Sequence, residues 1–452
     1  MGHAVRSPEP LTTAGTAGEA VPRAVASEGA GGFAWGFVSQ GFSSATNLGL
    51  TVIAARVLGP GGLGTVAIAF ASYLTILGFQ RALVTDPLVA QYASLPADVR
   101  ARSTRKALTV ALLGAAAAAG LLGLVGVAAH GSIGRALVIL APWLPALVIQ
   151  DFWRAVLFRD RRARSAATND ACWLFAMAVT APLAWWLGSD WAVVGCWGFG
   201  GLAGTLLGFA QTRARPHRPR RALLWWRTEL WPLGRWLGAT SLAYSVISYA
   251  TVIVLVGLVG TSGMGGLRAV TTVFAPLTLV GAALALPGLP ALTRALSVSP
   301  EAARKLALRL GVASALATTA YLAIMVLGGG SIVPRIFGSS FREFTDLVWP
   351  VGAGQLIAAL SVGVSLLLKA QRRGSAVLVT TAIGSITALA LVATLGASYG
   401  LLGAAWGLTA GAGVGFVTTT ALALRTNREV ASTTEPASSC EVDRDSRTVQ
   451  AR

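Results

Sequence analysis

The sequence predicts an all-α polytopic membrane protein with about twelve transmembrane helices in two six-helix bundles. Of its 452 residues, 54% are hydrophobic and 12% are charged, with a mean hydropathy of +0.66, whereas an average soluble domain is about 25% charged. Apolar runs long enough to cross a hydrocarbon core of about 30 Å recur along almost the whole chain. Basic residues gather in alternate connections, and the two halves of the chain resemble each other.

The expected elements can be assigned in order from the apolar runs. Polar tails and a basic linker divide the chain into 1–32, a disordered cytoplasmic tail; 33–212, the first bundle; 213–234, a linker with an interfacial helix; 235–425, the second bundle; and 426–452, a second disordered cytoplasmic tail. The expected spans are 33–55, 63–85, 107–129, 135–158, 171–188, 191–211, 235–259, 267–292, 306–328, 345–368, 375–396 and 400–424.

The short connections between these spans limit the function classes. No connection is long enough for a soluble catalytic domain, and no phosphate-binding G-x-x-x-x-G-K-[ST] motif occurs. His3, His130 and His217 are scattered and form no metal-ligand spacing. We therefore expect no enzyme, no catalytic residue, no metal and no cofactor.

The net charge of +18 is distributed as in a membrane protein. Of 36 Lys and Arg residues, 31 fall in the tails and in alternate connections, and five fall in the other connections, namely Arg56, Arg135, Arg268, Arg335 and Arg342. Cytoplasmic loops carry such an excess of basic residues, so both termini are predicted to be cytoplasmic. The expected partners of the basic loops are membrane lipids. Nucleic acid is not expected, because the charge lacks a folded basic face.

An internal repeat is the second organising feature. Three glycines around the first hairpin, Gly59, Gly62 and Gly64, recur 201 residues later as Gly260, Gly263 and Gly265. Segments 187–197 and 395–405 match at an offset of 208, and segments 157–162 and 367–372 match at an offset of 210. Three ordered matches favour two parallel six-helix repeats related by an axis along the membrane normal. Chance similarity of Ala- and Gly-rich helices is the alternative.

Charged residues inside the spans are the candidate site. Asp151 and Arg154 lie three residues apart on one helix face, and Asp151 is the only acid placed deep in a predicted span, about 12 Å from the end of its helix. An intramembrane charge faces a cavity or a partner, so a structural ion pair and a substrate role are both open. Arg56, Arg81 and Arg268 are either interfacial anchors or phosphate ligands, since the arginine fork can bind two oxygens at once.

The sequence resembles a known family at two places. The segment from Phe33 to Tyr92, with ARVLGPGGLGTVAIAF at 55–70, is similar to the opening of the polysaccharide-biosynthesis oligosaccharide flippases of the multidrug/oligosaccharidyl-lipid/polysaccharide exporter superfamily. The stretch 395–407 is similar to their penultimate connection. The resemblance implies a MATE-like fold, in which two bundles form a V around a cationic cavity. The positions proposed to bind the anionic substrate are Arg56, Arg81, Arg154 and Arg268.

The function implied by this resemblance is the flipping of a polyprenyl-diphosphate-linked oligosaccharide from the inner to the outer leaflet of a bacterial plasma membrane. The product would serve surface polysaccharide biosynthesis, with a polymerase and assembly proteins as partners. With no ATPase domain, coupling to an ion gradient is one source of energy, and Asp151 is the candidate coupling residue. Two alternatives are a multidrug or small-molecule exporter of the same superfamily, and a polysaccharide polymerase or ligase.

Overall fold

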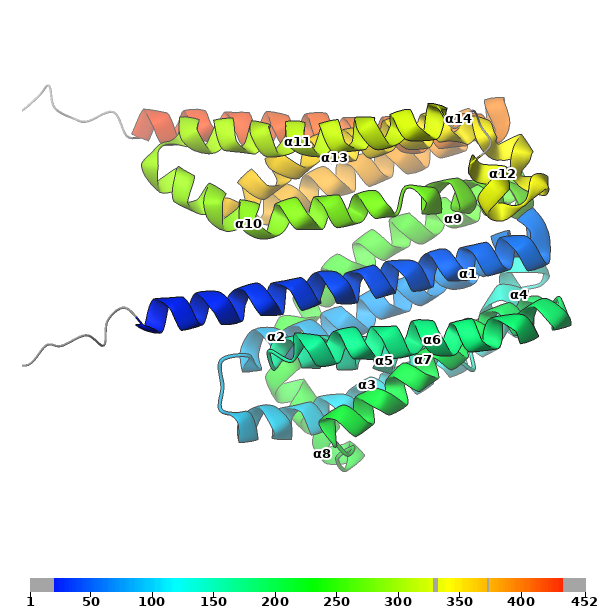
Figure 1. Ribbon diagram of the computed structural model, residues 1–452, viewed down its shortest axis with the longest axis horizontal. Helices are drawn as coiled ribbons and strands as arrows, with labels where there is room; N and C mark the ends of the chain where they lie inside the picture. Colours follow the sequence, from blue (N-terminus) through cyan, green and yellow to red (C-terminus); the bar gives the residue numbers. More distant parts are fainter. Residues whose placement is uncertain (1–19, 328–331, 372–373, 434–452) are drawn as a thin grey trace, which may run out of the picture.

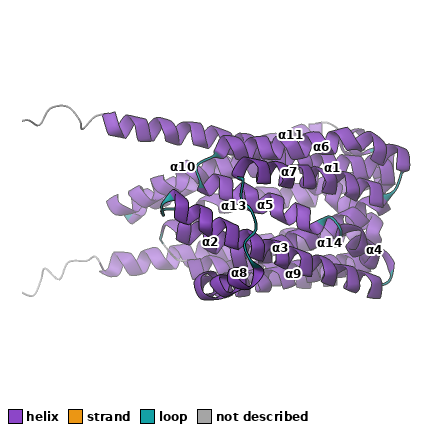
Figure 2. Cartoon of the chain, turned by 90° about the horizontal axis from the view of Figure 1, so that it is seen from below, coloured by secondary structure: helices purple, strands orange, loops and turns teal. Residues whose placement is uncertain are grey.

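The computed structural model describes residues 20–327, 332–371 and 374–433, and every element in these ranges is a helix. Figures 1 and 2 show the helices running roughly along one long axis. In chain order the elements are α1 (Ala20–Gln80), the π-helical turn η1 (Arg81–Thr85), α2 (Asp86–Tyr92), α3 (Ala97–Ala128), α4 (Gly131–Leu140), α5 (Leu144–Arg159), α6 (Ala163–Leu187), α7 (Asp190–Thr212), α8 (Pro219–Trp225), the π-helical turn η2 (Trp226–Leu230), α9 (Trp231–Val273), α10 (Pro276–Val298), α11 (Pro300–Leu327), α12 (Ile332–Phe337), the 3₁₀ turn η3 (Ser339–Leu347), α13 (Val348–Ala370) and α14 (Gly374–Thr433).

The helices form two groups that meet along α1 and α9. Figure 1 shows α1 to α7 in one group and α10 to α14 in the other, while α9 runs from the first group into the second. Helices α1 and α9 pack against each other, and η1 also contacts α9. The all-α fold of helical bundles predicted from the sequence is confirmed. The predicted linker, 213–234, contains α8 and η2 and leads into α9.

Two glycines at equivalent places in the repeat turn the chain in the same way. Gly59 has φ 69° and ψ −171°, and Gly260 has φ 67° and ψ −178°. L-residues with a side chain rarely adopt this backbone conformation, so glycine is required at both positions. Figure 1 shows α1 doubling back after its first half. The shared conformation at an offset of 201 supports a true duplication over chance similarity.

The two halves also touch through a reciprocal backbone contact. A Cβ atom on Gly64 would collide with the carbonyl group of Thr261, and a Cβ atom on Gly265 would collide with the carbonyl oxygen of Pro60. Gly265 lies 201 positions after Gly64, and Thr261 lies 201 positions after Pro60, so the two contacts are equivalent with the halves exchanged. Glycine at both positions therefore lets the halves approach backbone to backbone in a pseudo-twofold arrangement.

Eight of the described helices are long and apolar enough to cross a membrane, or nine if the bent pair α4 and α5 forms one span. The number is below twelve because α1, α9 and α14 each continue through a glycine bend. In α14, a methyl group on Gly384 would lie 3.0 Å from the Cα atom of Gly415, so this helix folds back on itself at Gly400. The count of twelve spans stays a prediction.

Proline residues explain two spans that differ from their predicted form. The span predicted at 135–158 is broken into α4 and α5, which are bent by 59°. Pro142 and Pro145 lie at the break, where their missing N–H groups leave helix carbonyls without partners. The span predicted at 267–292 is divided between α9 and α10, and Pro276 stands at the start of the new helix.

The described ends of the chain lie at the same end of the molecule (Figure 1). Helix α1 begins at Ala20 and α14 ends at Thr433, so both helices extend into segments that we expected to be disordered tails. Alanine has the highest helix propensity and is common at 20–34, which accounts for the longer first helix. Residues 1–19 and 434–452 lie outside the described part of the chain. The cytoplasmic location of both ends stays a prediction.

Candidate functional site

The first half contains a bidentate ion pair between Arg81 and Asp151. Arg81 Nε donates to Asp151 Oδ2 at 2.7 Å, and Arg81 Nη2 donates to Asp151 Oδ1. Arg81 opens η1 and Asp151 lies in α5, so the pair joins two helices that are 70 residues apart in the sequence. Two parallel N–H···O bonds fix the planes of both groups, which makes this the strongest form of ion pair available to a protein.

Proline chemistry explains the wide helical turn that carries Arg81. Pro87 has no N–H group, so the carbonyl oxygen of Leu83, four residues earlier, loses its usual helical partner. The indole Nε1 of Trp226, from η2, donates to this carbonyl at 2.9 Å instead. Residues 81–85 form a π-helical turn here, a feature that recurs at functional sites. The linker between the halves is thus attached directly to the turn that positions Arg81.

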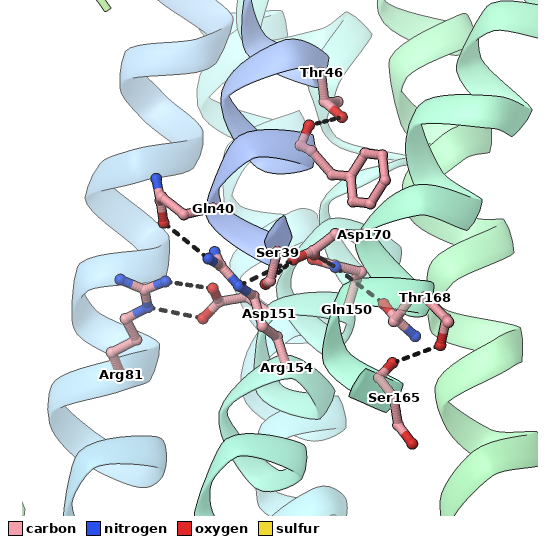
Figure 3. A network of polar contacts seen from close by, with 12 residues as sticks. Ser39, Gln40, Thr46, Arg81, Gln150, Asp151, Arg154, Ser165, Thr168 and Asp170 are labelled. Carbon is pink, nitrogen blue, oxygen red and sulfur yellow. Dashed lines mark hydrogen bonds and ion pairs between the residues drawn. The ribbon is translucent and has the colours of Figure 1, made fainter. Parts of the chain in front are cut away.

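A second ion pair lies beside the first. Arg154 Nε is 3.3 Å from Asp170 Oδ2, and Arg154 Nη2 donates to Gln40 Oε1 at 2.9 Å. Asp170 also accepts hydrogen bonds from the Ser39 hydroxyl and from Gln150 Nε2, the latter at 2.9 Å. Figure 3 shows these side chains converging from α1, α5 and α6. Because every oxygen of Asp170 has a partner, its charge is held within the helix bundle.

A glycine in α7 allows the network to continue to a fourth helix. Gln150 Nε2 also donates to Asn169 Oδ1 at 3.1 Å, and Asn169 Nδ2 donates to the carbonyl oxygen of Gly204 at 2.7 Å. A Cβ atom on Gly204 would lie 2.9 Å from Gln150 Cγ. Gly200, Gly204 and Gly208 lie four residues apart on one face of α7 and allow tight packing within the chain.

The four charged side chains differ in exposure. The side chains of Asp151 and Asp170 are 7% and 3% exposed, whereas those of Arg81 and Arg154 are 45% and 18% exposed. Each carboxylate is covered by its guanidinium, so the accessible charge of the network is positive. Within the described ranges, no group of three His, Cys, Asp or Glu side chains could hold a metal ion.

The structure changes one expectation about the acids. Asp151 and Arg154 share a helix face, but each pairs with a residue of another helix and not with the other. The network also contains a second buried acid, Asp170. This residue falls in the connection between the spans predicted at 135–158 and 171–188. Helix α6 begins at Ala163, eight residues before the predicted span, because its Ala-rich first turns are helical despite their polarity. The sequence feature that could have identified Asp170 as a site residue is the adjacent polar pair Asn169 and Asp170 just before an apolar run.

The four arginines predicted to bind substrate do not form one cluster. Arg81 and Arg154 belong to the network. Arg268, in α9, lies 4.2 Å from the ring centroid of Phe70 in α1 and so stands between the two halves. Arg56 is exposed and donates from Nε to the carbonyl oxygen of Ile336 at 2.8 Å, and from Nη2 to that of Arg335. Arg56 therefore ties α1 to α12, away from the ion pairs.

Solved structures of transporters have a fold similar to that of this chain. An inward-facing multidrug resistance MATE family transporter of the MOP superfamily matches with a TM-score of 0.68 and 12% identity over 87% of this chain and 95% of that one. Lipid II flippase MurJ, in an inward closed conformation, matches with a TM-score of 0.65 and 12% identity over 88% of this chain and 92% of that one. This is the fold of the MOP superfamily.

A third solved structure has a similar fold. A MOP superfamily transporter from Pyrococcus furiosus, whose binding pocket has reverse polarity, matches with a TM-score of 0.55 and 14% identity over 88% of this chain and 94% of that one. No family model and no curated protein matches the sequence. At these identities the likeness shows the fold alone.

Proposed function

We propose that this protein flips a polyprenyl-diphosphate-linked oligosaccharide from the inner to the outer leaflet by alternating access of its two halves. The observation that carries the proposal is the network of two ion pairs in which both acids are covered and both arginines are the more exposed partners. Arginine presents a planar fork that matches two phosphate oxygens. A site of this kind favours an anionic headgroup over the cations that a cavity of open carboxylates would attract.

The ion pair also suggests how binding and an ion gradient are coupled. A diphosphate that takes the fork of Arg81 leaves the carboxylate of Asp151 buried without its partner. An unpaired buried charge is costly, so Asp151 then takes up a proton or another cation. When the diphosphate leaves on the other side, Arg81 pairs with Asp151 again and the cation is released there. The cation and the diphosphate therefore cross in the same direction, so an outward-directed cation gradient would accelerate flipping and an inward-directed one would oppose it. Asp151 is the proposed coupling residue, and Arg81 the proposed first ligand.

The other predicted ligands have different proposed parts in this cycle. Arg154 lies beside Arg81 and would hold the second phosphate or an acidic sugar. Arg268 lies between α1 and α9 and would be met by the substrate as the halves separate. Arg56 bonds two carbonyl groups of the second half, so we assign it a stabilising role in place of a substrate contact.

The proposed setting is a bacterial plasma membrane in which a polymerase and assembly proteins consume the flipped product. Lipid II flippase MurJ, which shares the fold, is named for a lipid-linked substrate, and this supports the proposed class. The multidrug or small-molecule exporter has the same fold and differs in the charge of the ligand. A polymerase or ligase is the less favoured candidate, because the described outer connections are short.

A clean deletion with quantification of lipid-linked oligosaccharide and surface polysaccharide tests this proposal. We expect lipid-linked sugar to accumulate on the cytoplasmic leaflet and one surface polymer to be lost, with recovery by the wild-type gene. Unchanged glycans together with altered drug sensitivity would replace the proposal by the exporter. Repeat units that reach the outer leaflet but stay unpolymerised would indicate the enzyme.

A further inference from the structure

The first half contains a hollow beside the charged network. It has a volume of about 300 Å³ and is lined by residues of α1, η1, α3, α5, α8 and η2, nearly all of them apolar. Leu113 of α3 and Leu223 of α8 stand at this hollow with side chains that are 40% and 43% exposed. The volume is at the lower end for ligand sites, so the hollow has room for one narrow chain.

A single polar group in this hollow is without a partner. Gln80 is 8% exposed, and its Nε2 donor has no hydrogen-bond partner among the described residues. Buried amide donors are nearly always bonded. Gln80 Oε1 lies toward Gly114 in the hollow, and Nε2 is covered, so an occupant with one hydrogen-bond acceptor satisfies this donor once the amide turns Nε2 toward the hollow.

The hollow adjoins the charged network through consecutive residues. Gln80 lines the hollow, and the next residue, Arg81, forms the ion pair with Asp151. Because Gln80 and Arg81 are adjacent in the chain, a molecule with its anionic group at Arg81 can extend its neighbouring chain toward the hollow. Trp226 lines the hollow and bonds to Leu83, which fixes the position of the linker at its wall.

The charge around the linker matches an anionic occupant. Arg220, Arg221 and Arg227 are exposed on α8 and η2, next to the lining residues Leu223 and Trp226. Lys106 Nζ lies 5.5 Å from the ring centroid of Trp225. Positive charge beside an apolar hollow favours a chain that ends in a phosphate.

We propose that this hollow binds the first isoprenoid units of the lipid carrier, with Gln80 donating to an oxygen at the phosphate end of the chain. The inference rests on the proposed function and adds the position of the lipid tail. A two-chain phospholipid fits less well, because the narrow volume and the single donor suit one chain with one acceptor. The tail would enter past Leu113 and Leu223 while the headgroup binds at Arg81 and Arg154 of the charged network.

The test uses a polyprenyl monophosphate with a diazirine in the isoprene unit nearest the phosphate. The full-length protein in phosphatidylcholine nanodiscs is irradiated with this probe, and labelled peptides are mapped by mass spectrometry. Gly114→Leu fills the hollow, since a Cβ atom there has only Gln80 Oε1 within 4 Å, at 3.6 Å. Gly120→Leu is the matched control, because it lies on the same helix with nothing within 4 Å of its Cβ position.

We expect labelling of α1 and α3 at the hollow, a fall of at least fivefold in Gly114→Leu, and no change in Gly120→Leu. Unlabelled polyprenyl phosphate should compete, and phosphatidylglycerol should not. Equal competition by phosphatidylglycerol would make an ordinary membrane lipid the occupant and overturn the inference. Labelling only elsewhere, with flipping intact, would overturn the inference and leave the proposed function standing. Absence of both labelling and flipping would overturn both.

Discussion

The two halves of this protein share a scaffold and differ in chemistry. At the offset of 210, Asp151 corresponds to Ser361 and Asp170 corresponds to Thr380. Both of these second-half residues line a pocket of about 400 Å³ between α13 and α14. Where the first half has two buried acids paired with arginines, the second half has hydroxyl groups. The duplicated fold therefore does not require the charges, and their presence in one half marks that half as the candidate site.

The hydroxyl groups of the second half are largely satisfied by their own helices. Ser361 Oγ donates to the carbonyl oxygen of Ile357 at 2.8 Å, and Thr419 Oγ1 donates to that of Gly415 at 2.6 Å. Such bonds within one helix are a common way for Ser and Thr to be buried. The ion pairs of the first half, in contrast, join different helices and depend on how those helices are placed.

Replacing the four charged residues of the first half by neutral residues should have the largest effect on transport. The variant Arg81→Met/Asp151→Ser/Arg154→Val/Asp170→Thr gives the first half a neutral interior. We expect it to fold, because replacing whole buried ion pairs by neutral groups is often tolerated. Flipping in proteoliposomes should fall by at least about 100-fold, since two arginine–phosphate interactions worth about 1.5–3 kcal/mol each are lost.

The single variant Arg81→Met is the counterpart of this experiment. It leaves Asp151 buried without its partner, and breaking a buried pair in this way costs about 3–5 kcal/mol. We expect a lower melting temperature than that of the fourfold variant. Transport that persists in the fourfold variant would show that the network is structural.

Neutralising the proposed coupling residue should have the next largest effect. Asp151→Asn keeps the shape of the side chain but cannot bind a proton or cation in exchange for Arg81. We expect flipping to fall about tenfold, the order expected from losing a charged hydrogen bond, and to lose its dependence on the ion gradient. Asp190→Asn, which breaks the pair with Arg135 elsewhere in the same half, is the control. Unchanged gradient dependence in Asp151→Asn would end the coupling proposal.

Packing behind the network can be tested at Gly204. Gly204→Leu places a side chain against Gln150 and Asn169, and overpacking of this kind costs about 1–3 kcal/mol. We expect a lower thermal unfolding temperature, measured by size-exclusion chromatography of heated samples. Gly41→Leu, whose Cβ position has nothing within 4 Å, should leave that temperature unchanged. Equal stability of the two variants would contradict the close approach of α5, α6 and α7.

The smallest effect is expected in the second half. Ser361→Ala removes a hydroxyl group that bonds only to its own helix in the described contacts, so stability should change by less than about 0.5 kcal/mol and flipping by less than twofold. Thermal unfolding and the proteoliposome assay measure both. A large loss of flipping would show that the second half takes a direct part in substrate binding.

The sequence predicted the fold well because its signals are local. Apolar runs mark the helices, and Gly59 and Gly260 mark equivalent bends that the structure shares. The pairing of charges could not be predicted, because Arg81 and Asp151 lie 70 residues apart and meet only through helix packing. Asp170 was missed because the start of α6 is polar, so a hydropathy window begins too late. The contacts of Arg56 could not be predicted, because its partners are backbone carbonyl groups, which carry no sequence signal.

The reciprocal contact at Gly64 and Gly265 has a mechanical consequence. The backbones of the two halves are in close contact at Gly64 and Gly265. An opening that keeps this contact is a rotation of one half against the other about these glycines. Arg81 lies 17 residues from Gly64, which is about 26 Å along a helix, and at that radius a rotation of about 10° displaces the ion pair by about 4.5 Å. A small rotation at the two glycines therefore moves Arg81 and Asp151 by several ångströms relative to the second half.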